Sequence, residues 1–105
     1  MWRSVLAGTA ICVAASPAGA AEHPIHMAGS SYTPATVEAR VGDTLVFTND
    51  DGDAHNVFVP TVAFSTDLGK QDPGKSTRLI LTQPGTFEVE CVFHQHMTAR
   101  VNVSP

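Results

Sequence analysis

Basic side chains are scarce in this sequence. Its 105 residues contain six Lys and Arg against ten Asp and Glu, which gives a net charge of −4 when the histidines are neutral. Nucleic acids and anionic membrane surfaces attract proteins with the opposite balance. The composition therefore argues against nucleic acid or an anionic membrane as a partner.

Long apolar runs are equally scarce. The longest stretch of apolar and small residues spans 5–15, which is too short to cross a bilayer as a helix. Arg3 precedes it, and Ala18-Gly19-Ala20 follows with the small residues of a signal cleavage site. We therefore expect residues 1–20 to be a cleaved signal peptide that directs export to the periplasm. We expect residues 21–105 to form one small, monomeric domain that is not inserted in the membrane.

Only two cysteines occur, and one of them, Cys12, lies in the expected signal peptide. Cys91 is then alone in an exported protein, where thiols normally pair or oxidise. A lone exported cysteine indicates an intermolecular disulfide, a reactive thiol or a metal ligand. The residues around Cys91 favour the metal ligand.

Cys91 begins a short run of metal-binding side chains. His94 and Met97 follow it at steps of three, a spacing that suits a tight loop closing on one ion. Thiolate and thioether ligands beside an imidazole select copper over magnesium, calcium or manganese. The loop supplies three ligands, and His55 is the obvious fourth. Two His, one Cys and one Met form the ligand set of a blue-copper electron-transfer site, so we predict that these four residues bind one copper ion.

No segment sustains the 3.6-residue apolar period of an amphipathic helix. Short runs rich in β-branched and aromatic residues alternate instead with turn sequences such as those at residues 49–53 and 83–85. This pattern predicts an all-β fold, a Greek-key β-sandwich of about seven or eight strands. We expect residues 60–74 to be a long loop. The expected strands begin near residue 23 and continue at 36–41, 44–48, 55–59, 76–81, 86–91 and 98–103.

Strand parity provides an independent check on the metal hypothesis, because alternate residues of a strand share a face. Cys91 shares its face with Phe87 and Val89, and His55 shares its face with two valines. Met97 falls on the face of Ala99 and the following alternate valines. The predicted ligands outside the loop tip therefore face the core.

Each predicted ligand also has a simpler interpretation. His55 could cap the acidic turn at residues 50–53, whose side chains we expect to form a solvated face, and Met97 could be a core methionine. Cys91 and His94 could be a nucleophile and its base. A domain of about 85 residues offers little room for a substrate pocket, so we expect no enzymatic activity.

Two further alternatives to a copper site are less consistent with the residues. Structural zinc favours Cys and His without a thioether. A metal-free sandwich used for adhesion would leave Cys91 unexplained. Asn56 could be an ordinary turn residue, but its amide could also tie the His55 segment to the Cys91 segment, and such bonds hold metal ligands in place.

Four motifs are spread over nearly the whole mature chain: Val41-Gly42-Asp43-Thr44, Ala54-His55-Asn56-Val57, Pro84-Gly85-Thr86-Phe87 and Cys91-x-x-His94-x-x-Met97. They resemble motifs of the cupredoxins, most closely of the small amicyanin and plastocyanin group. The resemblance implies a type 1 copper protein in which His55, Cys91 and His94 are equatorial ligands and Met97 is the weak axial one. It also implies single-electron transfer between redox protein partners in the periplasm.

Two features depart from that resemblance. The family usually has an apolar residue or proline after the second ligand histidine, whereas Gln95 and His96 stand here and predict a polar docking patch. The chain also has more imidazole and thioether donors than an electron carrier needs, at His23, His26, Met27 and His96. Both features favour an alternative function, copper binding for tolerance or delivery.

Cleavage after Ala20 would expose a further copper-binding sequence. The free amine of Ala21, two backbone amides and the imidazole of His23 can surround Cu(II) in the tetragonal geometry that this ion prefers. We therefore predict a second, weaker copper site there, with His26, Met27 and His96 as further donors. The alternative is that the histidines at this end are ordinary surface residues.

Overall fold

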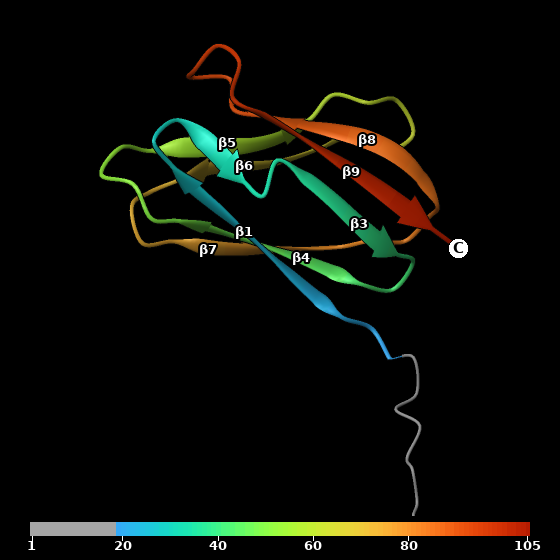
Figure 1. Ribbon diagram of the computed structural model, residues 1–105. Coiled ribbons are helices and arrows are strands. Elements are labelled where there is room, and N and C mark those ends of the chain that lie inside the picture. The colour runs from blue at the N-terminus through green and yellow to red at the C-terminus, as the bar shows by residue number, and fades with distance from the viewer. Residues whose placement is uncertain (1–18) are drawn as a thin grey trace, which may run out of the picture.

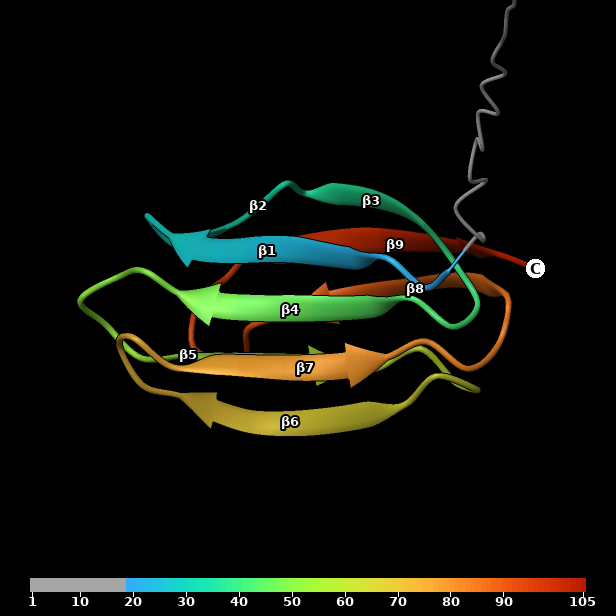
Figure 2. The same cartoon turned by 90° about the horizontal axis from the view of Figure 1, so that it is seen from below.

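The computed structural model describes residues 19–105, so the predicted signal peptide lies outside the described residues except for its last two positions. The described chain forms two β-sheets packed face to face (Figures 1 and 2). One sheet has the strand order β2-β1-β4-β7, and the other has the order β3-β9-β8-β5-β6. Residues 19–105 contain no helix, and hence none that could cross a membrane.

Both sheets are mixed, because β1 pairs with β4 and β3 pairs with β9 in parallel, whereas the other neighbours are antiparallel. The predicted all-β sandwich is thus confirmed, with nine strands rather than seven or eight. The strands are β1 (Glu22–Ala28), β2 (Ser31–Thr33), β3 (Thr36–Arg40), β4 (Thr44–Asn49), β5 (His55–Val59), β6 (Thr66–Gln71), β7 (Ser76–Ile80), β8 (Gly85–Glu90) and β9 (Thr98–Ser104).

The prediction of a long loop over residues 60–74 was wrong, because this segment contains the strand β6. This strand has little apolar alternation, and its Gly69 has a φ of 80° next to the register shift opposite Val57 and Phe58. β6 lies at a sheet edge and pairs with β5 alone. Main-chain hydrogen bonds to β5 therefore define this strand more than its side-chain pattern does.

The core lies between the two sheets and is built from the inward-facing alternate residues. Phe47 of β4 is fully buried and meets the Tyr32 ring edge-on, with the ring centroids 6.3 Å apart. At the other end Phe64 stacks on Phe87, with centroids 4.9 Å apart. These rings belong to one core cluster with buried apolar residues of both sheets, and burial of that cluster favours the face-to-face packing.

The fold brings the predicted copper ligands to one end of the sandwich. His55 is the first residue of β5, and residues 91–97 form the loop from β8 to β9, which projects from the same end (Figure 1). β5 and β8 are neighbours in one sheet and pair through Phe58 and Glu90. The loop therefore closes over the start of β5.

Candidate metal centre

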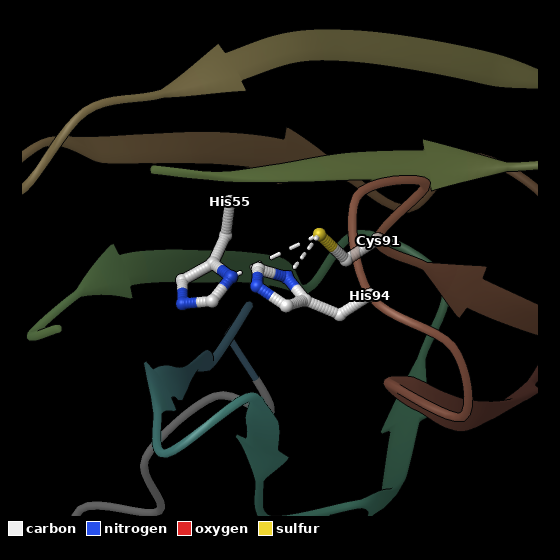
Figure 3. A group of neighbouring side chains, drawn as sticks. All are labelled: His55, Cys91 and His94. Atoms are coloured by element: carbon white, nitrogen blue, oxygen red, sulfur yellow. Dashed lines mark hydrogen bonds between the residues drawn. The ribbon is translucent and has the colours of Figure 1, made fainter. Parts of the chain in front are cut away.

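Three donor atoms converge beneath the β8–β9 loop. Cys91 Sγ lies 3.6 Å from His94 Nδ1 and 3.8 Å from His55 Nδ1, and the three side chains point toward one another (Figure 3). All three donor atoms lie within 4.8 Å of each other. A tetrahedral metal ion at about 2.3 Å from sulfur and 2.0–2.1 Å from nitrogen separates these atoms by roughly 3.6 Å. The spacing therefore fits one shared ion.

Cys91 is a buried, unpaired thiol within the described residues, with 3% of its surface exposed. The backbone N–H of Asn56 donates to its Sγ at 3.4 Å. The Asn56 side chain in turn accepts a hydrogen bond from the backbone N–H of Val92 at 2.7 Å. Asn56 thus ties the β5 segment to the Cys91 segment and provides a hydrogen bond that stabilises a thiolate.

Met97 closes the loop. Its carbonyl accepts a hydrogen bond from the Cys91 N–H at 3.1 Å, and its side chain is 1% exposed. Cys91, His94 and Met97 line one surface hollow. The thioether is therefore held in the same loop as the thiol and one imidazole, as the sequence predicts for a fourth donor.

His55 is fully buried, and its two ring nitrogens face different partners. Nδ1 faces Cys91, whereas Nε2 lies 2.9 Å from the carboxylate of Asp51. A carboxylate can only accept a hydrogen bond, so Nε2 carries the proton and Nδ1 presents its lone pair to the site. A carboxylate partner of this kind fixes the ring orientation and raises the basicity of the ligand.

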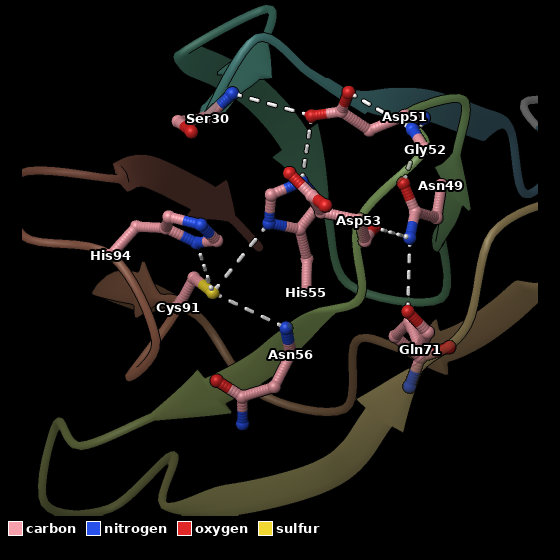
Figure 4. A network of polar contacts seen from close by, with 10 residues as sticks. All are labelled: Ser30, Asn49, Asp51, Gly52, Asp53, His55, Asn56, Gln71, Cys91 and His94. Atoms are coloured by element: carbon pink, nitrogen blue, oxygen red, sulfur yellow. Dashed lines mark hydrogen bonds and ion pairs between the residues drawn. The ribbon is translucent and has the colours of Figure 1, made fainter.

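Asp51 is itself held in place (Figure 4). Its backbone N–H donates to the Asn49 side chain at 2.9 Å, and its carboxylate accepts from Gly52 N at 3.1 Å and Ser30 N at 3.5 Å. The hydrogen bond from His55 is the main cause that lowers the pKa of Asp51, so the group is ionised at neutral pH. Asp51 therefore takes part in the site and is more than a solvated turn residue.

Sequence reasoning missed the site role of Asp51, although its position four residues before His55 in a turn was a usable signal. It also missed Tyr32. The Tyr32 hydroxyl donates to the Asn56 carbonyl at 2.6 Å, and burial, followed by the nearby Cys91 and Glu90, raises the pKa of Tyr32. Tyr32 thus supports the segment whose N–H contacts the thiol.

The outer surface of the loop is more apolar than the sequence suggested. Gln95 and His96 are exposed, as expected for a polar patch. Val92 and Phe93, however, are 62% and 54% exposed on the same loop. His94, which follows Phe93 in this loop, is half-buried. The loop therefore offers an apolar contact surface next to one predicted ligand.

The residues of the predicted second copper site do not all come together. Met27 is fully buried in the core, whereas His26 points outward from the other face of β1 and contacts Asp50. His96 lies on the β8–β9 loop. The Ala21 N–H and the His23 imidazole both contact Asp43, at 2.9 and 2.8 Å. Copper binding at residues 21–23 stays a prediction.

Comparisons with known structures agree with the β-sandwich fold. The chain is 24% identical to a purple cupredoxin from Nitrosopumilus maritimus, with a TM-score of 0.71, covering 78% of this chain and 99% of that one. It is 21% identical to an oxidised methionine-to-leucine mutant of amicyanin, with a TM-score of 0.74 and coverage of 78% and 81%.

A copper-containing nitrite reductase from Thermus scotoductus also matches, at 24% identity and a TM-score of 0.73. It covers 93% of this chain but 25% of the reductase. A comparison with curated protein sequences gives no match. The family model of the cupredoxin-like domain matches residues 3–103, nearly the whole chain. The chain, in which His55, Cys91 and His94 converge on one point, therefore belongs to the cupredoxin-like family.

Proposed function

We propose that the mature chain is a periplasmic mononuclear type 1 copper protein that carries single electrons between redox protein partners. The observation that supports this proposal is the convergence of His55, Cys91 and His94 within 4.8 Å, with the thiol buried. Met97 is the proposed axial ligand. Copper held there supplies a one-electron change between Cu(I) and Cu(II).

The protein contributes a rigid site. The Asp51 carboxylate contacts the His55 ring from a turn in which the Asp51 N–H is bound by Asn49. The Asn56 N–H contacts the Cys91 sulfur from the start of β5. Ligands held in this way keep their positions in both oxidation states, so little needs to rearrange during electron transfer. His94 is half-buried, whereas His55, Cys91 and Met97 are buried, so His94 is the most exposed of the proposed ligands, and it follows the exposed Val92 and Phe93 in the loop.

The sizes of the related structures support an electron carrier rather than an enzyme. This chain covers 99% of the purple cupredoxin and 81% of the amicyanin mutant, but it covers 25% of the much longer nitrite reductase. The amicyanin structures include oxidised, reduced and Cu(I) forms. A metal that is stable in both states is what a single-electron carrier requires.

Electron self-exchange between the Cu(I) and Cu(II) forms tests the proposed function without a known partner. Two molecules must meet at their copper ends, so Phe93→Asp is expected to lower the self-exchange rate constant at least about tenfold through like-charge repulsion. Val62→Asp is the matched control, because Val62 is 87% exposed in the β5–β6 loop, beyond the end of β5 opposite His55. NMR line broadening of mixed-valence samples measures the rate.

Equal effects of the two substitutions would contradict transfer through the Phe93 surface. A protein that holds copper but exchanges electrons too slowly to measure would contradict the carrier function. In that case, a deletion strain that became sensitive to copper would favour the alternative of copper tolerance or delivery.

Asp51→Asn is expected to raise the reduction potential. The Asp51 carboxylate makes His55 a stronger donor and so favours Cu(II), and a neutral amide removes this effect. A tenfold loss of preference for Cu(II) corresponds to about 59 mV in a one-electron couple. Voltammetry should show a shift of at least this order. Asp50→Asn, which removes a neighbouring charge that contacts His26 instead, should change the potential much less; equal shifts would mean that only net charge matters.

A further inference from the structure

Asp43 is a carboxylate buried at the start of β4, far along the sandwich from the copper ligands. It is 4% exposed and receives three hydrogen bonds. The Ala21 N–H donates to Oδ1 at 2.9 Å, while the Arg40 N–H at 3.0 Å and the His23 ring at 2.8 Å contact Oδ2. These contacts, that of Ala21 first, lower the pKa of Asp43 to about 2.

The backbone holds Asp43 firmly in this place. Its N–H donates to the Arg40 carbonyl at 3.0 Å, and its carbonyl accepts from Leu81 at 2.8 Å. The neighbouring Thr44 N–H donates to the Ala21 carbonyl at 3.0 Å, just before the parallel pairing of Glu22 with Thr44 begins. The Ala21 N–H is therefore hydrogen-bonded to Asp43 in the β3–β4 turn, and the Ala21 carbonyl is hydrogen-bonded to Thr44 at the start of β4.

Ala21 is also the residue that cleavage after Ala20 would make the first of the mature chain. Hydrolysis of the Ala20–Ala21 peptide bond adds one water molecule across it and leaves a carboxylate on Ala20 and an amine on Ala21. The amine takes up a proton near neutral pH, since its ordinary pKa is about 7.7–8.0. A buried carboxylate is costly without a countercharge. The new ammonium provides that charge at the Ala21 nitrogen, which already donates a hydrogen bond to Asp43.

We propose that Asp43 is the binding site for the amino terminus that cleavage between Ala20 and Ala21 creates. Cleavage turns a neutral amide hydrogen bond into a charge-assisted one, which fixes the first residue of β1 to the start of β4. The Ala21 amine is also one nitrogen of the predicted second copper site, whereas His23 contacts Asp43 through Nε2 and leaves Nδ1 unused. Copper binding at residues 21–23 would therefore have to break the contact between the Ala21 amine and Asp43, which would weaken that site. This proposal does not depend on the copper function.

The first test is the start of the exported protein. Full-length chain is expressed in a bacterium that exports it, and the intact mass of the periplasmic product is measured. A product that begins at Ala21 supports the proposal, and one that begins elsewhere overturns it.

The second test compares chains that begin at Ala21 and at Gly19. Both contain all nine strands and an Ala21 N–H, but only the first has a charged amine at Asp43. In urea unfolding at neutral pH, the chain from Ala21 should have an unfolding equilibrium constant about two- to fivefold smaller. With Asp43→Asn in both chains, the difference should disappear. Equal stability of the parent chains, or a difference that survives Asp43→Asn, overturns the proposal.

Amine labelling gives a readout that needs no substitution at Asp43. An amine-reactive ester is added to the folded chains at neutral pH, with Lys70 and Lys75, both exposed, as internal controls. The amine of Ala21 should react at least about threefold more slowly, relative to the lysines, than the amine of Gly19. Equal relative rates would show that the terminus is not bound and would overturn the proposal.

Discussion

Replacing Cys91 by serine is expected to abolish the intense visible absorption of the Cu(II) protein. That absorption arises from charge transfer between a bound thiolate and copper, and the other three predicted ligands provide no thiolate. Serine has a similar size, and its hydroxyl can still accept the hydrogen bond from the Asn56 N–H. The β fold should therefore persist in far-UV circular dichroism while nearly all of the colour is lost.

Val92→Ser is the matched control for this experiment. It places the same new side chain at the next residue, which is 62% exposed and is not a predicted ligand. This variant should keep the visible band. A Cys91→Ser protein that retained the band would refute the assignment of the thiolate ligand and, with it, the type 1 site.

Replacing Met97 by glutamine is expected to lower the reduction potential, because an oxygen donor is harder than a thioether and favours Cu(II) over Cu(I). Met97→Leu, which offers no donor at all, should raise it. A tenfold change in the preference between the two states corresponds to about 59 mV, so voltammetry can resolve both shifts. Opposite signs are the diagnostic result, because a core residue that only packs against the loop would give shifts of the same sign or none.

The strand arrangement near the site could be predicted because its residues follow clear local rules. Val57, Val59, Phe87 and Val89 alternate with more exposed residues and are buried in the structure. The copper-type donor set could be predicted because the loop carries three donors within seven residues. Local sequence therefore contained most of the information about the ligand loop and about the faces of the strands that flank it.

Other features depend on distant partners and could not be predicted in this way. β6 exists because β5 offers a free edge, and no pattern within residues 66–71 announces it. The contact of Asp51 with His55 depends on the fold of the acidic turn, in which Asn49 accepts a hydrogen bond from the Asp51 N–H. The surface of the ligand loop became apparent only when the exposure of Phe93 was known.

The parallel pairing of β3 with β9 has a consequence for the order of folding. Residues 36–40 pair with residues 100–104, so one sheet cannot be completed until the last strand of the chain is in place. Contacts between such distant residues form slowly. Cys91, which is 3% exposed in the finished protein, precedes that last strand and is open to oxidants and stray metals until it docks. The speed at which the C-terminal strand joins the sheet therefore determines how long the thiol is at risk before the fold protects it.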